Sequence, residues 1–318
     1  MKNQILEKIL QRTTGEEYDV AVMYSGGKDS AYLLYLLKEI YHLRVVAVTV
    51  DNGYENEYMW EKMKQFTKSR NVPLEIVRPG KELFQQLFHM LIVEKEYFAK
   101  EGINHICFIC NNILWCCVSQ YAAQNNIPFV ASGLSLAQLS SGREKPLLPD
   151  KMANAIAEKS TKKIFYNALA GMEKSKCFCN SKKLKKFVLQ LGENIKKVKT
   201  LYPYIYHTIS VEDMKNTLSD LNWQPPRPIG IDRYISSGCK IMSEVIYELE
   251  KIGLITLNER EQAKSMVQNG LADEKELKFA NYDASQDVVN LSGVLMEELD
   301  IKEYLLQICK CKNKEVIL

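Results

Sequence analysis

A short apolar run followed by a glycine loop constrains the fold more than any other feature of this 318-residue sequence. Residues 19–24 are mostly apolar, residues 25–30 read Ser-Gly-Gly-Lys-Asp-Ser, and residues 31–41 have the apolar pattern of a helix. Two adjacent glycines let the backbone approach an anion closely, and the N–H groups and dipole of a following helix attract negative charge. The order strand, glycine loop, helix therefore predicts a phosphate-binding turn at the end of the first strand.

Side chains in this loop suit a nucleotide phosphate. Lys28 supplies a mobile positive charge, Ser25 and Ser30 supply hydroxyl donors, and Asp29 can hold Mg²⁺ or orient the lysine. The loop is not a Walker A motif, because Val22 stands where that motif needs its first glycine, and the fingerprint Gly-x-Gly-x-x-Gly is also missing. The loop therefore indicates neither a P-loop NTPase nor the usual dinucleotide-binding site.

Strand and helix patterns continue to alternate after the loop. Apolar runs predict strands at 44–50, 74–77 and 128–132, and periodic segments predict helices at 55–69, 83–100 and 112–125. Alternation of this length is typical of a parallel sheet with helices on both faces. Because the composition is that of an ordinary globular protein, with 46% hydrophobic and 25% charged residues, we predict an α/β Rossmann-like fold.

Strand patterns become scarce in the last third of the chain. Residues 202–206 are expected to form a last strand, and helical patterns follow at 211–221, 240–252, 258–268 and from Leu295 onward. We therefore divide the chain into a nucleotide-binding α/β domain over residues 1–206 and a smaller, mainly helical region over residues 207–318.

Positive charge is concentrated in residues 151–199. This segment holds 13 Lys against 3 Glu, a net charge of +10 in a chain whose total is only +3. A concentrated basic segment indicates a polyanionic partner such as RNA. Because the segment also carries a helical apolar stripe, a solvated helix face is the alternative interpretation.

The glycine loop resembles the signature of the PP-loop ATP pyrophosphatases, the adenine nucleotide alpha hydrolase-like superfamily. That signature is Ser-Gly-Gly-x-Asp-Ser after the first strand of a Rossmann-like sheet, and it is matched at Ser25, Gly26, Gly27, Asp29 and Ser30. The resemblance implies binding of ATP and Mg²⁺, transfer of AMP to a substrate oxygen and release of pyrophosphate. In this scheme Lys28 and Asp29 are the catalytic residues, because both would act on the charge of the polyphosphate.

Two further turns are expected beside the nucleotide. Asp51 belongs to an Asp-Asn-Gly sequence that ends the second strand, where open α/β sheets bind ligands, although the same sequence also forms ordinary turns. Gly133 lies in residues 132–141, which resemble the Thr-Gly-x-Ser-Leu-Gly-Gln-Val-Ala-Ser segment of the tRNA 4-thiouridine sulfurtransferases. We expect Asp51 to contact the nucleotide and Gly133 to let the backbone pass close to ATP. The second resemblance favours sulfur chemistry without fixing the substrate.

Nine cysteines in a chain without an export signal are expected to be reduced, so their spacing is informative. Cys107 and Cys110 form a C-x-x-C motif that we place just ahead of a helix, and Cys239 precedes another predicted helix. This order resembles the tRNA 2-thiolation branch of the superfamily, in which a C-x-x-C and one distant cysteine hold a [4Fe-4S] cluster. The resemblance implies that the fourth iron binds a sulfide, which attacks the adenylated carbon. Because the chain lacks the His-rich acidic motif common in that branch, the subfamily stays open.

Other interpretations of the cysteines remain. The C-x-x-C can be a dithiol that passes on a persulfide, or half of a zinc site that a further cysteine completes. The candidates for completing such a zinc site are Cys116, Cys117, Cys177 and Cys179. Cys309 and Cys311 receive no predicted role.

These patterns together predict an ATP-dependent sulfurtransferase that replaces the carbonyl oxygen of a tRNA base or a small carbonyl compound with sulfur from a separate donor. One alternative is an amide-forming ligase of the same superfamily, with zinc or no metal at the cysteines. Another, outside the enzymes, is a nucleotide- or RNA-binding regulator without turnover.

No stretch approaches the roughly 20 uncharged apolar residues of a membrane helix, and the start lacks a signal peptide, which predicts a cytoplasmic protein without a membrane partner. A homodimer stays open.

Overall fold

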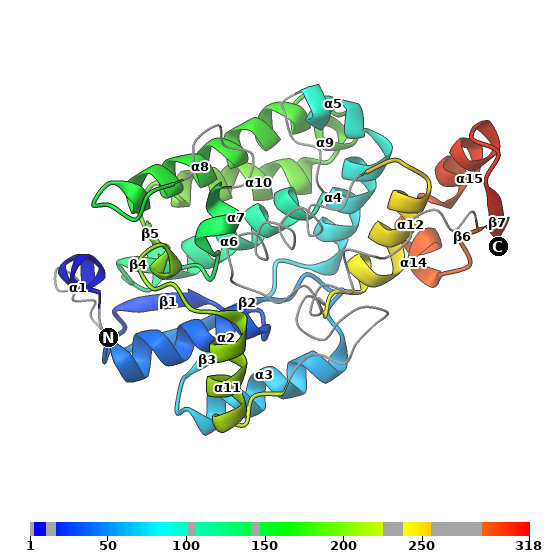
Figure 1. Cartoon of the computed structure of the whole chain (residues 1–318). Coiled ribbons are helices and arrows are strands. Elements are labelled where there is room, and N and C mark those ends of the chain that lie inside the picture. Colours follow the sequence, from blue (N-terminus) through cyan, green and yellow to red (C-terminus); the bar gives the residue numbers. More distant parts are fainter. Residues whose placement is uncertain (1–2, 11–16, 101–105, 141–146, 225–237, 256–287) are drawn as a thin grey trace.

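A five-stranded parallel sheet forms the centre of the protein (Figure 1). The computed structural model describes residues 3–10, 17–100, 106–140, 147–224, 238–255 and 288–318. The strands lie in the order β3-β2-β1-β4-β5 and are β1 (Val20–Met23), β2 (Val45–Val50), β3 (Leu74–Val77), β4 (Phe129–Ala131) and β5 (Lys199–Leu201). Each neighbouring pair is parallel, which confirms the predicted α/β fold with a Rossmann-like sheet.

Alternate side chains of the strands face two different layers of helices, as the period of two along a strand requires. Ala21, Val46 and Val48 belong to one buried cluster, and Val20, Val22 and Val45 belong to the other. The first cluster includes residues of α4 (Lys81–Val93), α6 (Ile106–Gln124), α8 (Ala153–Met172) and α10 (Lys182–Asn194). The second includes residues of α1 (Gln4–Leu10), α2 (Lys28–Tyr35), α3 (Glu57–Ser69) and α11 (Val211–Asp220). Figure 1 shows these two layers on opposite sides of the sheet.

The strand order places a change of direction beside β1. The chain passes from β1 through β2 to β3 at one edge, and then returns to form β4 and β5 on the other side of β1. Ligands of open α/β sheets bind outside the carboxyl ends of the strands at such a switch point. The loops after β1 and β4, which contain Ser25 and Gly133, meet at this position.

The C-terminal part contains more than the expected helices. It includes α12 (Tyr247–Lys251), α14 (Val294–Glu298) and α15 (Lys302–Cys311), and also a two-stranded parallel sheet of β6 (Val288–Asn290) and β7 (Glu315–Ile317). Buried side chains of this part belong to the same cluster as α4 and α6. His89 Nδ1 of α4 lies 2.9 Å from the carbonyl oxygen of Leu299. The helix predicted at residues 258–268 lies outside the described residues.

Short elements complete the description. They are the helices α5 (Lys95–Lys100), α7 (Leu136–Ser140) and α9 (Lys176–Asn180), the π-helical turns Leu36–Ile40 and Met242–Ile246, and the 3-10 turn Pro203–Ile205. The helix expected at 83–100 is divided at Glu94, whose backbone angles of φ −111° and ψ 31° are not helical.

The last strand of the sheet was predicted three residues too late. Strand β5 spans Lys199–Leu201 and pairs with β4, whereas Pro203–Ile205 forms the 3-10 turn. Proline has no N–H to donate to a ladder, so Pro203 cannot continue the strand.

Helix α6 begins at Ile106, six residues before its predicted start, so the C-x-x-C lies inside its first turns rather than ahead of it. Its 19 residues contain no charge, which makes the expectation that no such stretch exists wrong. By length and composition α6 could cross a membrane, but 61% of its most apolar 18-residue stretch is buried inside the protein. Burial of this kind is also found in the core helices of globular proteins.

A buried hydrogen bond connects α6 to the edge strand β5. Trp115 Nε1 donates to Thr200 Oγ1 at 3.1 Å, and both residues are at most 3% exposed. We expect Trp115→Phe to lower the free energy of unfolding by about 1–3 kcal/mol, because it leaves the threonine hydroxyl buried without its donor. In the Trp115→Phe/Thr200→Val double variant this penalty should become smaller than the sum of the single effects. Denaturant unfolding of the four proteins measures the coupling, and strict additivity would show that the hydrogen bond contributes nothing.

Candidate active site

The glycine loop lies between β1 and the first turn of α2. Helix α2 begins at Lys28, three residues earlier than predicted, with Gly27 as its N-cap. Gly26 has a φ of +76°, a conformation that side chains disfavour. Ser30 Oγ ties the turn together, because it accepts from the Ser25 N–H at 3.2 Å and donates to the Gly27 carbonyl oxygen at 3.0 Å. The loop therefore presents backbone amides at a helix N-terminus, as the sequence predicted.

Lys28 and Asp29 form an ion pair at the start of the helix. Lys28 Nζ lies 2.7 Å from Asp29 Oδ1, with 12% of the lysine side chain and 43% of the aspartate side chain exposed. The carboxylate therefore holds the lysine beside the loop, which is one of the two roles expected for Asp29. The exposed part of the same carboxylate remains accessible to a cation from solvent.

Three residues from other parts of the chain contact the backbone of the glycine loop and of the first turn of α2. Tyr204 donates its hydroxyl to the Asp29 carbonyl oxygen at 2.5 Å, and Trp223 Nε1 donates to the Gly26 carbonyl oxygen at 3.1 Å. A Cβ atom on Gly133 would lie 3.4 Å from the Asp29 backbone, so Gly133 packs closely against the first turn of α2. No local pattern singles out Tyr204 or Trp223, because both contacts join parts of the chain that are distant in sequence.

Asp51 follows the end of β2 and stabilises a turn. Its Oδ1 accepts from the Gly53 N–H at 2.9 Å, and its Oδ2 lies 3.7 Å from Arg78 Nε. This geometry is that of an Asx turn, the ordinary role that the sequence also allowed. A nucleotide contact by Asp51 stays a prediction.

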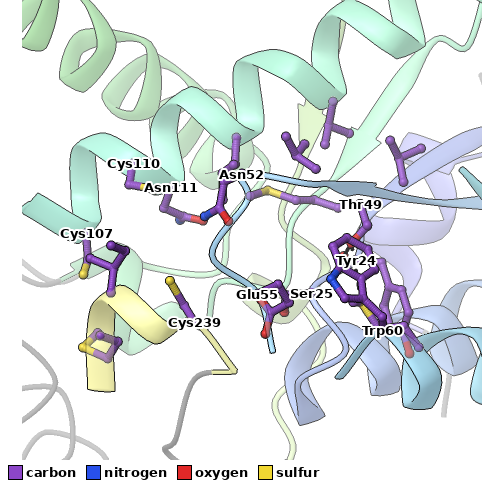
Figure 2. A pocket seen from close by; sticks show the side chains of 18 of the residues that line it. Tyr24, Ser25, Thr49, Asn52, Glu55, Trp60, Cys107, Cys110, Asn111 and Cys239 are labelled. Atoms are coloured by element: carbon purple, nitrogen blue, oxygen red, sulfur yellow. Dashed lines mark hydrogen bonds between the residues drawn. The ribbon is translucent and has the colours of Figure 1, made fainter. Parts of the chain in front are cut away.

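A cavity of about 300 Å³ lies at the carboxyl ends of β1 and β2 (Figure 2). Its walls include Ser25 of the glycine loop together with Cys107, Cys110 and Cys239. The structure therefore brings the three cysteines singled out from the sequence to one site beside the loop. Seven other predicted site residues lie in the described chain but not on these walls, namely Gly26, Gly27, Lys28, Asp29, Ser30, Asp51 and Gly133.

Cys239 reaches the cavity through a short antiparallel bridge with Glu55. The Asn56 N–H donates to the Gly238 carbonyl oxygen at 3.1 Å, and the Lys240 N–H donates to the Tyr54 carbonyl oxygen at 2.8 Å. Cys107 and Cys110 reach it from the first turns of α6. Two segments distant in sequence thus supply the three thiols.

Asn52 contacts two of these thiols. It is 7% exposed, its Oδ1 accepts from the Tyr54 N–H at 2.9 Å, and its side chain forms hydrogen bonds with Cys110 and Cys239. Burial raises the pKa of Cys110 strongly and that of Cys239 to about 11, while the Asn52 hydrogen bonds oppose this rise. Asn52 follows Asp51 directly in the sequence, but it was not among the predicted site residues.

Glu55 is a second wall residue that sequence reasoning missed. Burial raises the pKa of this carboxyl to about 7, the Asn56 N–H opposes the rise, and the charge of Asp51 adds to it. Among the described wall residues there is no Lys, Arg or His to balance Glu55. A carboxyl group in such surroundings is a candidate for function.

All nine cysteines are thiols, as expected, and the three on the cavity walls match the donor set of an iron–sulfur cluster. Within the described ranges, no group of three or more His, Cys, Asp or Glu side chains is close enough to hold a single metal ion. A tetrahedral zinc ion needs its ligands to converge on one point, whereas a multi-iron cluster is held by thiolates at separate corners. Three thiols on one cavity wall are the ligand type that either an iron–sulfur cluster or a zinc ion takes, so both interpretations of the cysteines remain.

The sheet order and the glycine loop after β1 make a Rossmann-like α/β fold of the adenine nucleotide alpha hydrolase-like type. Residues 18–135 match the model of a family of unknown function, DUF7411. A curated protein of Methanocaldococcus jannaschii, called a probable sulfurtransferase, is 28% identical over 123 residues. That match covers 37% of this chain and 36% of the relative, so the chain spans about a third of the relative's length.

Three solved structures are also similar. The U34-tRNA thiolase NcsA of Methanococcus maripaludis, with its [4Fe-4S] cluster, is 19% identical at a TM-score of 0.39, covering 83% of this chain and 76% of that one. The NH3-dependent NAD synthetase of Campylobacter jejuni is 15% identical at 0.32, covering 60% and 89%. The NMN synthetase of Francisella tularensis is 12% identical at 0.33, covering 99% and 95%. Similarity at this level does not identify the activity of this chain.

The two loop glycines provide a matched pair of substitutions. A Cβ atom on Gly26 would lie 2.6 Å from Met63 Cγ at a φ of +76°, whereas one on Gly27 would meet nothing closer than 3.5 Å. We expect Gly26→Ala to lower the free energy of unfolding by about 1–2 kcal/mol or more, and Gly27→Ala to change it by less than about 0.5 kcal/mol. Thermal or denaturant unfolding measures both. Equal stability of the two variants would contradict the left-handed conformation at Gly26.

Proposed function

We propose that this protein is an ATP-dependent sulfurtransferase that adenylates a carbonyl oxygen and replaces it with sulfur. One observation carries the proposal: Ser25 of the phosphate-binding loop and the thiols of Cys107, Cys110 and Cys239 line the same cavity. Transfer of sulfur to an adenylated carbon requires an activated substrate and a sulfur source at one place. An amide-forming ligase has no such need for three thiols beside its nucleotide loop.

The loop residues would carry out the adenylation half of the reaction. The amides at the start of α2 and the Lys28 ammonium stabilise the negative charge that develops on the leaving pyrophosphate. Asp29 holds Lys28 in place, and its exposed oxygen is available to a Mg²⁺ ion bound to the polyphosphate. Ser25 lies where the loop meets the cavity, so its hydroxyl can orient the phosphate nearest to the acceptor oxygen.

The three cavity thiols would hold a [4Fe-4S] cluster. A cluster bound by three thiolates supplies one iron with an open position for a sulfide. Asn52 orients the Cys110 and Cys239 sulfur atoms through its hydrogen bonds. Because burial raises the pKa of Cys110 and Cys239, metal binding must release the protons of these two thiols.

The acceptor would be a tRNA base or a small carbonyl compound. Support for an RNA comes from α8 and α10, where most of the lysines of residues 151–199 are exposed. The apolar stripe of α10 is buried at Leu184, Val188 and Leu191, so the charged face points to solvent. A polyanion would find a long positive surface there.

Lys28 is the direct test of the adenylation step. We expect Lys28→Ala to reduce acceptor-dependent release of pyrophosphate from ATP by at least about a hundredfold, because the variant loses the charge that stabilises the leaving group. Lys64→Ala, which removes an exposed lysine from α3, serves as the control and should retain activity. Wild-type turnover in Lys28→Ala would remove this lysine from the mechanism.

Metal content tests the sulfur-transfer half. Protein purified without oxygen should contain about four irons and a matching amount of sulfide per chain, with the absorption spectrum of a cluster. Cys107→Ala and Cys239→Ala should lose this iron, and Cys311→Ala, which changes an exposed cysteine near the C-terminus, should keep it. Zinc or no metal in the wild-type protein would rule out the cluster, and persulfide transfer or amide ligation would then lead.

A further inference from the structure

Helix α4 joins the C-terminal segment 288–318 to the rest of the chain. Lys81, Gln85 and His89 are spaced four residues apart, so they lie on one face of this helix. Lys81 Nζ lies 2.7 Å from Glu298 Oε1, and the Gln85 amide donates to the Glu298 carbonyl oxygen. His89 Nδ1 lies 2.9 Å from the carbonyl oxygen of Leu299. Successive turns of α4 therefore hold the C-terminal end of α14, where carbonyl groups lack partners within the helix.

Lys81 also contacts the segment that follows β2. Its ammonium group lies over the ring of Tyr54, 5.1 Å from the ring centre, and a Cβ atom on Gly53 would collide with the Lys81 side chain. Tyr54 is 1% exposed, and its ring packs edge-on against Phe88 with 5.5 Å between the ring centres. One ammonium group thus makes both the cation–π contact with Tyr54 and the ion pair with Glu298.

Tyr54 lies directly beside the bridge that brings Cys239 to the cavity. Its carbonyl oxygen accepts from the Lys240 N–H at 2.8 Å, and Lys240 follows Cys239 in the chain. The bridging pair is Glu55 with Cys239, so Tyr54 and the bridge are consecutive. The position of Tyr54 therefore helps to determine where the Cys239 thiol lies.

The other side of the bridge meets α14 as well. The π-helical turn Met242–Ile246 follows Cys239, and α14 packs against it (Figure 1). Apolar side chains of this turn and of α14 belong to one buried cluster, namely Val245, Ile246, Leu295 and Met296. Helix α14 therefore contacts both segments of the bridge, one through polar groups of α4 and the other through direct apolar packing.

We propose that the C-terminal segment 288–318 positions the Cys239 thiol at the cavity, and that Glu298 and Lys81 are its positioning residues. With 49% of the Lys81 side chain and 25% of the Glu298 side chain exposed, the ion pair itself adds little to global stability. Its effect is local, because it joins α14 to the segment that holds Cys239. The consequence for sulfur transfer rests on the proposed function, whereas the mechanical connection does not.

Hydrogen exchange measures the hold on Cys239 in the full-length protein without ATP or turnover. The reporters are the amides of Asn56 and Lys240, which donate across the bridge. We expect Glu298→Gln and Lys81→Met each to raise these two exchange rates by about twofold to fivefold, since local opening becomes easier when a half-exposed ion pair is lost. Lys81→Arg keeps a cation for both contacts and should retain the wild-type rates.

Glu297→Gln provides the matched control in the same helix. Glu297 pairs with Lys302 at 2.8 Å, and 68% of its side chain is exposed. This variant should leave the exchange of Asn56 and Lys240 unchanged, and the Ala31 amide in α2 should keep its rate in every variant. Unchanged exchange at the bridge in Glu298→Gln and Lys81→Met, an equal effect of Glu297→Gln, or a uniform rise that includes Ala31 would each overturn the proposal.

Iron release connects this positioning to the metal site. In protein that contains iron, a chelator should remove it about twofold to fivefold faster from Glu298→Gln than from Glu297→Gln, because Cys239 would be one of the cluster ligands. Equal release from the two variants would show that the contact does not position Cys239. A wild-type protein without iron would remove the cluster from the proposed function, and the exchange rates would still decide the positioning role, so the two failures are distinguishable.

Discussion

The candidate site depends on two backbone hydrogen bonds between the segment after β2 and the segment around Cys239. Asn56 donates to Gly238, and Lys240 donates to Tyr54, at 3.1 and 2.8 Å. The bridge fixes Cys239 beside the segment after β2, and burial of Ile241 and Val245 in the same cluster as α6 holds the following turns against the helix that carries the C-x-x-C. Gly238 also makes room for the Glu55 side chain, since a Cβ atom there would lie 2.0 Å from Glu55 Oε1. One short piece of antiparallel pairing thus positions both Cys239 and Glu55 at the cavity.

Parallel strands explain why chemistry from separate segments converges here. In a parallel sheet all carboxyl ends lie at one edge, so Ser25 after β1 and Asn52 after β2 are brought together by strand pairing alone. Helix α6 crosses the same face of the sheet and places its first turns at this edge. The cysteines therefore need no special loop to approach the nucleotide side, because the βα architecture already positions them.

The parts of the fold and site that could be predicted are those encoded in short stretches of the sequence. The glycine loop and the order of Cys107, Cys110 and Cys239 were visible because a strand, a tight turn and a C-x-x-C are local in sequence. Asn52 was within reach of the same reasoning: Val46 and Val48 face α6, and the period of two carries this orientation on to Asn52. Glu55, Tyr204 and Trp223 could not be predicted, since their roles come from contacts with residues far along the chain. Helix α6 started early because Ile106, Ile109 and Cys110 are buried as part of its apolar face.

Positively charged side chains and the buried carboxyl group occupy different parts of the protein. Lysines cover the surface of α8 and α10, Lys28 stands at the phosphate loop, and the described cavity walls hold a carboxyl group and thiols but no cation. Low polarity raises the pKa of Cys110 and Cys239, so thiolates form there only when a metal or another electrophile replaces the proton. Asn52 and the backbone N–H groups of Ile241 and Met242 reduce this cost at Cys239. A positive charge on the cavity wall would lower these pKa values and that of Glu55 together. With no cation among the described wall residues, burial raises the pKa of Glu55 as well as those of the two thiols, and activation of the thiols is left to metal binding.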